Sequence, residues 1–299
     1  MTDPGRPAGR RAAGAAVVPI LLVVVLMWGG SYPAIKATQP FFPPLAFAMF
    51  RCAVAAVILT AVGLLTGAWR ATLQPRDWGA VALVGLFGNT LFHGLLVTGI
   101  HRTSPGNAAI LVALSPVLAV LLARLLHGEP VGARRLGGIA LGFAGVALIV
   151  ARGNQDTSST AGDLLCLGAS LAWALYTVVG KPLLARATPL TVTTWATVIG
   201  VVPLLPFGLP GIGEVRWSAL TVWEWLLLAY LSAGTIAFAN LLWYVALART
   251  ATARVVGFSF LVPLIATAIA VLAGQETLTV SLAVGAVAVL AGVALAHRA

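Results

Sequence analysis

Nine ring, amide and imidazole side chains lie deep within the apolar stretches of this sequence. They are Trp28, Tyr32, Asn89, His93, Trp173, Tyr176, Asn240, Trp243 and Tyr244. Polar groups at membrane depth are costly, so they usually mark a binding site or a solute pathway. Aromatic rings stack on a solute, while amides and imidazoles hydrogen-bond to it. We therefore expect these residues to line a central cavity.

Helical spacing places some of these residues on shared faces. Trp28 and Tyr32 are four residues apart, as are Asn89 and His93, and residues four apart lie on one face of an α-helix. For any single aromatic residue, simple packing or an interfacial belt is the competing interpretation. His93 is either a hydrogen-bonded structural residue or a substrate contact, and in the second role it could act as a proton-linked switch.

Arg51 and two prolines are candidates for electrostatic or gating roles. Arg51 lies about two turns into an apolar segment, where it either snorkels or binds helix carbonyls, or else attracts a substrate carboxylate. Pro116 and Pro263 lie in the middle of two further segments. A proline there frees a carbonyl and bends the helix, which predicts either a static kink or a hinge.

Several types of charged site and catalytic motif are missing from the sequence, and their absence narrows the possible functions and substrates. None of the eight acidic residues falls at the centre of an apolar segment, which disfavours a lipophilic cation as substrate. No ring of Lys or Arg marks the midplane, which disfavours sugar phosphates. The sequence contains no zinc-protease, P-loop or nucleophile-elbow motif. We therefore expect no enzyme, no ATP-driven pump, no cofactor and no metal site, and we interpret Cys52 and Cys166 as small apolar core residues.

The composition predicts an all-α membrane protein with several spans. Of the 299 residues, 60% are hydrophobic and 9% are charged, whereas soluble domains carry about 25% charged residues. The net charge of +10 could suit nucleic acid, but the basic residues are scattered over short loops. The positive-inside rule explains them better, so the expected partners are the lipid bilayer and a small molecule rather than nucleic acid.

Ten segments are long enough to cross a bilayer. We place them at 17–36, 43–65, 78–99, 104–126, 132–151, 161–181, 189–208, 222–246, 252–273 and 278–297. Residues 1–16 are rich in Gly, Ala, Pro and Arg, and we expect a disordered cytoplasmic tail there. The spans divide into two five-helix halves, 17–151 and 161–299, within one integral membrane domain.

The basic residues also set the orientation. Of the 18 Lys and Arg residues, 13 fall in the N-terminal tail, the C-terminus and the loops on that same side. The opposite side holds Lys36, Arg102, Arg152 and Arg216, and Arg51 lies within a span. This asymmetry predicts that both termini are cytoplasmic, which requires an even number of spans. Lys36 and Lys181 are expected to cap helix ends and to anchor them at the interface.

The two halves repeat each other. The segment 99–130 aligns with 246–277 at an offset of 147 without a gap, and Trp28 corresponds to Trp173 at an offset of 145. An odd number of spans per half places the second half upside down relative to the first. Such inverted repeats are typical of transporters, whose substrate site lies between the halves. Repeat mates such as Trp28 and Trp173, or His93 and Asn240, should therefore meet around a central cavity.

Small residues mark the last span of each half. Gly138 and Gly142 are four apart in the fifth span, and Gly145, Gly285 and Gly292 extend the pattern to the tenth. Small residues let helices in lipid approach closely. These two spans are therefore expected to be either scaffold or the seam of a homo-oligomer.

The whole pattern resembles the EamA-type transporters of the drug/metabolite transporter superfamily. The residues that carry the resemblance are 27–32 (Met-Trp-Gly-Gly-Ser-Tyr), Pro44, Arg51, 103–116, Glu129, Pro130, Trp173, Tyr176, Lys181, 249–263 and Glu276. The resemblance implies a ten-helix, inverted-repeat exporter in the inner (plasma) membrane of a bacterium. Bacterial exporters of amino acids, aromatic ones included, are the most similar branch.

We therefore expect a secondary transporter that exports small zwitterionic metabolites, above all amino acids with hydrophobic or aromatic side chains. Transport would proceed by alternating access or facilitated diffusion through the central cavity. The absence of a buried carboxylate favours uniport over proton antiport. The alternatives are another neutral metabolite, such as a purine or a sugar, and a non-transporting membrane sensor or assembly factor.

Overall fold

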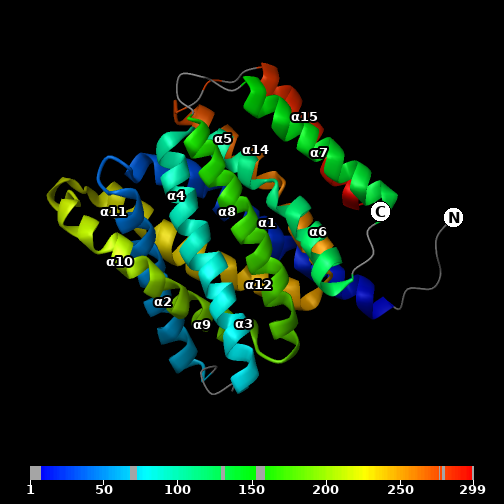
Figure 1. Cartoon of the computed structure of the whole chain (residues 1–299), viewed down its shortest axis with the longest axis horizontal. Coiled ribbons are helices and arrows are strands. Elements are labelled where there is room, and N and C mark those ends of the chain that lie inside the picture. The colour runs from blue at the N-terminus through cyan, green and yellow to red at the C-terminus, as the bar shows by residue number, and fades with distance from the viewer. Residues whose placement is uncertain are drawn as a thin grey trace.

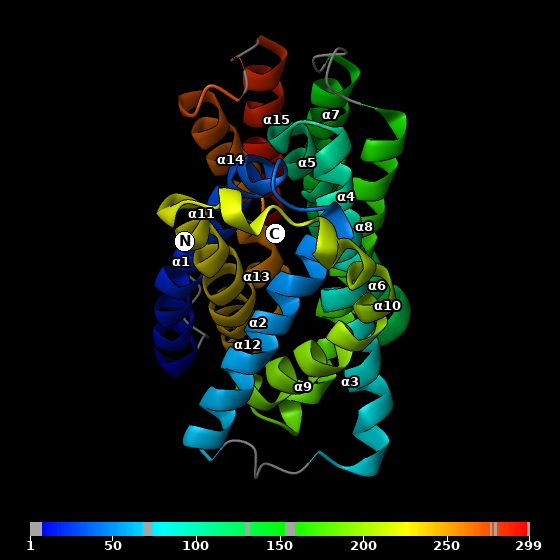
Figure 2. The same cartoon turned by 90° about the vertical axis from the view of Figure 1, so that its left-hand side faces the viewer.

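The chain folds into an elongated bundle of helices (Figure 1, Figure 2). The computed structural model describes residues 8–67, 73–128, 132–152, 159–275, 277 and 280–297. Within these residues every regular element is a helix and no strand forms. The expected tail, residues 1–16, lies partly outside the described residues, and α1 begins within it at Ala8.

The α-helices are α1 (Ala8–Thr38), α2 (Pro44–Leu65), α3 (Trp78–Gly85), α4 (Phe92–Arg102), α5 (Pro105–Val112), α6 (Ser115–His127), α7 (Ala133–Arg152), α8 (Thr160–Gly180), α9 (Pro189–Val201), α10 (Leu205–Gly208), α11 (Val222–Ala229), α12 (Ala239–Arg249), α13 (Thr252–Phe258), α14 (Leu261–Leu272) and α15 (Val280–His297). Two π-helical segments, η3 (Leu86–Leu91) and η8 (Tyr230–Phe238), join neighbouring α-helices. Short 3-10 helices are η2 (Pro75–Asp77), η4 (Lys181–Ala185), η5 (Val202–Leu204), η6 (Pro210–Glu214) and η7 (Trp217–Ala219).

Eight runs of helix in the described residues are long and apolar enough to cross a membrane. They are Val17–Thr38, Pro44–Leu65, Pro75–Arg102, Pro105–Leu126, Thr160–Ala185, Pro189–Gly208, Val222–Arg249 and Arg254–Leu272. Each coincides with one expected span. The other two expected spans fall on α7 and α15, whose apolar stretches are shorter, at Leu136–Gly145 and Ala283–Gly292. The protein is thus an all-α, multi-span structure, and the count of ten spans stays a prediction.

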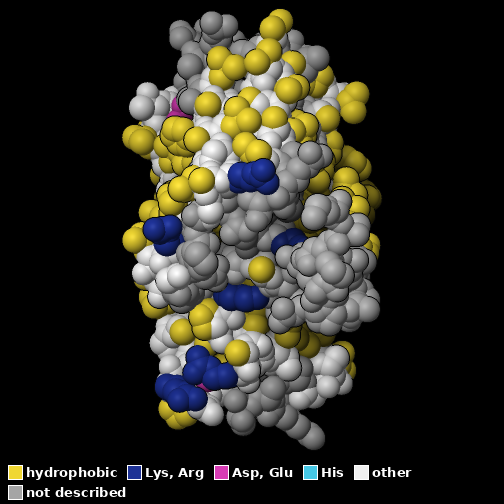
Figure 3. Space-filling model, turned by 90° about the vertical axis from the view of Figure 1, so that its right-hand side faces the viewer, with side chains coloured by type: hydrophobic (Ala, Val, Ile, Leu, Met, Phe, Trp, Pro, Cys, Tyr) yellow, Lys and Arg dark blue, Asp and Glu magenta, His cyan; other side chains and the backbone are white. Residues whose placement is uncertain are grey.

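The outer surface is suited to lipid. Leu65 and Leu272 each expose 87% of their area, and Figure 3 shows hydrophobic side chains spread over one face with few Lys and Arg between them. Large exposed apolar side chains also occur along many other helices, and extensive apolar surface marks a membrane or partner contact. The lateral surface therefore supports the membrane interpretation of the composition.

Four of the spanning runs are interrupted near their middle. In two of them η3 and η8 replace regular α-helical turns, and π-helical turns often occur at functional sites. In the other two, α5 ends at Val112 before α6 begins at Ser115, and α13 ends at Phe258 before α14 begins at Leu261. The prolines explain the second pair of breaks, because Pro116 and Pro263 lack the N–H that would continue the helix.

Helix packing in one half is matched in the other. α1 packs against α12 and α14, while α8 packs against α4 and α6. The corresponding elements of the two halves also meet directly, because α2 packs against α9 and α7 packs against α15. Figure 1 shows the α7–α15 pair side by side at the margin of the bundle. The central bundle is therefore formed by helices of both halves.

Two lysines join helices within each half, at opposite ends of the bundle. The Nζ of Lys36 donates to the carbonyls of Ile100 (3.0 Å) and Thr103 (3.1 Å) at the end of α4. The Nζ of Lys181 donates to the carbonyls of Leu247 and Thr250 at the end of α12, at 2.8 Å for Thr250. Each lysine therefore caps a helix other than its own. We call these the Lys36 end and the Lys181 end of the bundle.

The α7–α15 contact depends on glycine. A Cβ at Gly292 would lie 2.6 Å from both the Gly138 carbonyl oxygen and the Gly142 nitrogen. These are backbone atoms of α7, so a side chain can be accommodated only if the helices separate. The small residues noted in the sequence therefore pack the two helices against each other within one chain.

We expect Gly292→Ala to destabilise the protein. The added methyl group would push α7 and α15 apart, and overpacking of this kind typically costs about 1–3 kcal/mol. Gly137→Ala is the matched control, because its Cβ would meet only Cδ2 of Leu295 at 3.8 Å. The midpoint of thermal unfolding in detergent should fall for the first variant and stay near wild type for the second. Equal midpoints would contradict this interpretation of the contact.

Candidate functional site

A central pocket lies among helices of both halves, with about 550 Å³ of empty space that includes the open solvent at its mouth. Its walls come from α1, α2, α4, α5, α6, α8, η8, α12 and α14, and from the two helix breaks at Ala113 and Ser259. The lining residues are Trp28, Ser31, Tyr32, Arg51, Phe92, His93, Leu96, Ala109, Val112, Ala113, Ser115, Trp173, Thr235, Asn240, Ser259 and Val262. On α1 the lining runs from Trp28 toward Tyr32, so the pocket extends from the middle of the bundle toward the Lys36 end.

Repeat mates face each other across this pocket. Trp28 and Trp173 both line it, and so do His93 and Asn240. The same holds for two further pairs at the offset of 147, which are Val112 with Ser259 and Ser115 with Val262. The pocket therefore lies where corresponding positions of the two halves converge, as the repeat predicted.

An aromatic cluster closes the inner end of the pocket. The Trp28 ring lies 4.9 Å from that of Trp173 and 5.0 Å from that of Trp243, measured between centroids. Phe92 lies 4.7 Å from Trp173 on the other side. Edge-on and tilted contacts of this kind are favourable for aromatic rings. The cluster offers an apolar, polarisable surface to a bound solute.

Three of the expected cavity residues lie behind the rings of Trp28, Trp173 and Phe92 that line the pocket. Tyr176, Trp243 and Tyr244 expose at most 1% of their area and do not line the pocket. The Tyr176 ring lies 4.7 Å from that of Trp173, and the Tyr244 hydroxyl donates to the Tyr176 carbonyl at 3.1 Å. They occupy the space between the pocket and the Lys181 end. In this conformation they pack against the floor of the pocket and are not open to a solute there.

Asn89 also lies away from the pocket, although it is four residues before His93. It is buried against α9, where a Cβ at Gly200 would lie 2.7 Å from the Cβ of Asn89. Asn89 belongs to η3. Of this pair, only His93 lines the pocket, while Asn89 packs against α9.

Arg51 is held rigidly at the pocket wall. It exposes 1% of its area, and its Nε and Nη2 donate to the Leu231 carbonyl at 3.2 and 3.1 Å. Nη2 also donates to Oγ1 of Thr235 at 3.1 Å. Among the described residues, Nη1 has no hydrogen-bond partner. Arg51 thus binds helix carbonyls, as one of its two sequence interpretations proposed, and it also lines the pocket.

Other buried polar atoms of the pocket wall lack partners within the described part of the chain. Both ring nitrogens of His93 and the Oγ of Ser259 are in this group. Buried polar groups are almost always hydrogen-bonded, so each exception requires an explanation. Because these groups line a cavity, a bound solute or water can satisfy them. In this conformation neither ring nitrogen of His93 bonds to another described residue.

Pro116 and Pro263 lie beside the pocket rather than in its wall. Each follows a helix break by two or three residues, and the breaks themselves contribute Ala113 and Ser259 to the lining. The carbonyl that Pro116 leaves free, that of Val112, accepts a hydrogen bond from the Ser170 hydroxyl at 3.3 Å. A hinge at these positions stays a prediction.

Some pocket residues were not singled out from the sequence. Thr235 connects two of the predicted residues, because its carbonyl accepts from Trp28 Nε1 at 3.2 Å while its hydroxyl accepts from Arg51. Phe92 and Ser31 also line the pocket. The hydroxyl groups of Thr235 and Ser31 within apolar segments were the available signal, but Phe92 carries none that separates it from ordinary packing residues.

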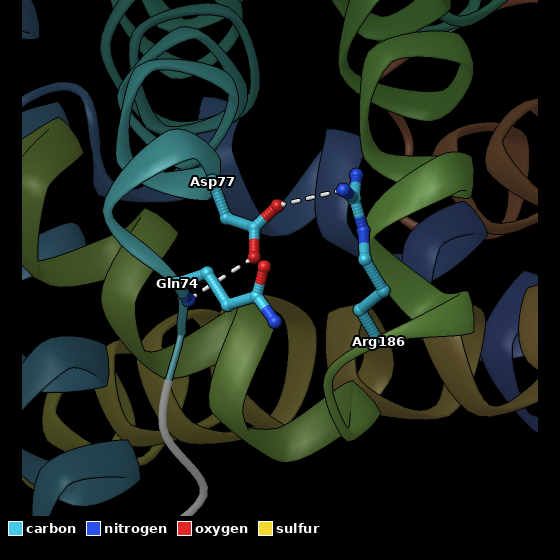
Figure 4. A network of polar contacts seen from close by, with 3 residues as sticks. All are labelled: Gln74, Asp77 and Arg186. Atoms are coloured by element: carbon cyan, nitrogen blue, oxygen red, sulfur yellow. Dashed lines mark hydrogen bonds and ion pairs between the residues drawn. The ribbon is translucent and has the colours of Figure 1, made fainter.

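An ion pair closes the Lys181 end of the bundle. Asp77, at the start of α3, accepts from the Gln74 backbone N–H at 3.1 Å and pairs with Nη1 of Arg186 at 3.2 Å (Figure 4). The Asp77 side chain is 3% exposed. This pair joins a segment of the first half to the segment between η4 and α9 of the second.

Taken together, a multi-span helical bundle with a central solute-sized pocket is the architecture of a membrane transport protein. The chain belongs to the EamA-like transporter family, whose family model matches residues 16–151 and again residues 160–298. This is a family of membrane transporters rather than of enzymes, and the resemblance noted in the sequence is confirmed.

Individual relatives cover nearly the whole chain. A "probable terminal-alkyne amino-acid exporter" of Streptantibioticus cattleyicolor is 31% identical over 93% of this chain and 92% of its own. The uncharacterized transporters YvbV and YyaM of Bacillus subtilis are 30% and 28% identical, over 93% and 92% of this chain and 90% and 91% of theirs. A solved crystal structure shares the fold with a TM-score of 0.72 at 20% identity, over 95% of this chain and 97% of that one.

Proposed function

We propose that the protein exports small zwitterionic metabolites, above all amino acids with hydrophobic or aromatic side chains, across the plasma membrane of a bacterium. The observation that carries this proposal is the composition of the pocket wall. Tryptophans form its floor, while Arg51, His93 and Ser259 carry polar atoms that lack partners among the described residues. A solute with an apolar body and one polar end is complementary to both surfaces. The relative named as an amino-acid exporter supports the same substrate class.

The proposed transport cycle uses ten spans in two inverted halves with cytoplasmic termini. The matched packing of α1 and α8 supports the inverted arrangement, as does the convergence of repeat mates at the pocket. Positive-inside charge places the Lys36 end outside and the Lys181 end in the cytoplasm. On α1 the pocket lining runs from Trp28 toward Tyr32, on the side of the Lys36 end, which supports release of substrate at the outer side.

Loading from the cytoplasm would then require the opposite end to open. The aromatic cluster, the three residues behind it and the Asp77–Arg186 pair all lie between the pocket and the cytoplasm. Alternating access would separate these contacts while the halves close over the pocket at the Lys36 end. Arg51 and the two prolines are the proposed electrostatic and hinge elements of this motion.

The test is flux through purified protein in proteoliposomes, with labelled amino acids, purines and sugars, with and without a pH gradient. We expect saturable flux of apolar and aromatic amino acids that needs no imposed gradient. His93→Ala should raise KM about threefold to tenfold, the usual effect of losing one hydrogen bond. His101→Ala is the matched control, because His101 lies exposed at the end of α4.

Each outcome separates the hypotheses. If only purines or sugars are transported, the proposed substrate class is wrong, but the pocket remains the proposed binding site. If flux rises strongly with an imposed pH gradient, transport is coupled to protons and is not uniport. Absence of flux for all three classes would favour a non-transporting role. An unchanged KM in the His93 variant would remove that residue from the binding site.

A further inference from the structure

We infer that the pocket recognises its substrate through a carboxylate bound at Nη1 of Arg51, and that it does not require the substrate's amino group. This inference rests on the proposed function, because it concerns the same pocket. It goes further than the proposed function by predicting the pocket's selectivity. An amino acid and the acid that lacks its amino group should both bind, and the amine that lacks the carboxylate should not.

The first step is the geometry of the guanidinium group. Arginine has five N–H donors, of which two are on Nη1. The Nε and Nη2 donors are directed at the Leu231 carbonyl and the Thr235 hydroxyl, both of η8. The two N–H groups of Nη1 are buried and have no acceptor among the described residues. Arg51 is therefore fixed by one edge and offers the remaining nitrogen to the pocket.

The second step is the charge of Arg51. A buried cation is costly unless an anion pairs with it, and carboxylate oxygens are the strongest partners for a guanidinium group. Among the described acids, Asp77, Asp163, Glu214 and Glu224, none lines the pocket. Asp77 pairs with Arg186, and Asp163 accepts from Thr103 and Asn107 outside the pocket. A substrate carboxylate would supply the anion.

The third step concerns the opposite charge. The described pocket wall holds no carboxylate that could pair with a substrate ammonium group. The polar groups there, on His93, Asn240 and Ser259, are uncharged acceptors and donors when His93 is neutral. A carboxylate at Arg51 forms a pair in which both groups are charged, whereas an ammonium group in the described pocket wall meets only neutral acceptors. The carboxylate should therefore contribute more to binding than the amine.

The aromatic floor accommodates the remainder of the solute. Arg51 and Trp28 contact the same residue, Thr235, through its hydroxyl and its carbonyl. The acid-binding group and the tryptophan wall are therefore fixed next to each other by η8. A solute with its carboxylate at Arg51 can place an aromatic or aliphatic side chain against Trp28 and Trp173.

The experiment measures the affinity of wild-type protein for four phenyl compounds by titration calorimetry. They are phenylalanine, 3-phenylpropionate (no amine), phenethylamine (no carboxylate) and phenylalaninamide (neutral in place of the carboxylate). We expect the first two to bind with similar Kd, and the last two to bind at least about 10-fold more weakly. Because the series uses wild-type protein, the result does not depend on the folding of a variant.

Two variants locate the effect at Arg51. Arg51→Gln should remove the difference between 3-phenylpropionate and phenylalaninamide. Because this change also releases η8 and could unfold the protein, Thr235→Val serves as the second variant. It keeps the arginine and removes one of its two anchors, and it should weaken 3-phenylpropionate binding while leaving phenethylamine unchanged.

The outcomes distinguish the inference from the proposed function. If 3-phenylpropionate and other monocarboxylates bind but no amino acid is transported, the amino-acid assignment fails and the carboxylate site stands. If phenethylamine binds as tightly as 3-phenylpropionate, the inference is wrong even where phenylalanine is exported. If none of the carboxylates binds, the inference is wrong as well.

Discussion

Replacing Trp173 with alanine should lower substrate flux at least about 10-fold in protein that still folds. The Trp173 ring lines the pocket and contacts the rings of Trp28, Phe92, Tyr176 and Trp243. Its loss would remove the surface on which an apolar side chain rests, and it would also leave a gap between the pocket and the cytoplasmic half. Flux per milligram of monodisperse protein in proteoliposomes is the measurement.

Two further variants separate binding from folding in this experiment. Removing a buried tryptophan side chain typically costs about 3–5 kcal/mol of stability, so Trp173→Phe retains a ring and should give intermediate flux with near-normal unfolding. Trp225→Ala is the matched control, because Trp225 is 47% exposed and stacks only on Trp217 among the ring contacts found. Wild-type flux and KM in Trp173→Ala would exclude the aromatic floor from the binding site.

The pairing of the halves could be predicted because the sequence repeats itself at a constant offset. Trp28 and Trp173 occupy equivalent positions, and the structure brings their rings into contact. His93 and Asn240 are equivalent as well and line the same pocket. Eight of the ten expected spans could likewise be located, because a bilayer imposes a minimum apolar length that the composition shows directly.

The depth of each side chain in the site could not be predicted in the same way. The helical spacing of Asn89 and His93 does not tell which neighbouring helix covers each side chain, and Asn89 packs against Gly200 of α9. Tyr176 and Tyr244 are polar aromatic residues at the expected level, but their neighbours cover them. A Cβ at Gly88 would lie 2.0 Å from Cδ2 of Tyr176, so a glycine on another helix decides where that ring lies.

The hydrogen-bond acceptors of Arg51 could not be predicted from the sequence either. Its acceptors, the Leu231 carbonyl and the Thr235 hydroxyl, are 180 and 184 residues away. A backbone carbonyl carries no sequence signal, so neither the rigid orientation of the guanidinium group nor its remaining nitrogen could be foreseen. The sequence identified a costly charge, and only the structure showed which part of it remains available to a ligand.

Crosslinking the Lys181 end should stop transport reversibly. In the double variant Asp77→Cys/Arg186→Cys, a short bis-methanethiosulfonate reagent would form a disulfide with each cysteine, releasing methanesulfinate. It would thereby tie α3 of the first half to the segment between η4 and α9 of the second. If the cycle opens this end to the cytoplasm, flux should fall to background after crosslinking and return after reduction. The native Cys52 and Cys166 are fully buried, so the reagent should react first with the introduced pair.

The comparison is made within each variant, before and after treatment, because loss of the ion pair alone can change the resting flux. Removing Arg186 alone leaves the buried Asp77 carboxylate without its ion-pair partner, whereas replacing both residues does not. Each single-cysteine variant, treated in the same way, should keep its own untreated flux. Full flux through the crosslinked double variant would show that this end need not separate. The proposed alternating access between the two halves would then be wrong. Substrate would instead follow a pathway in which the Asp77 and Arg186 positions stay together throughout the cycle.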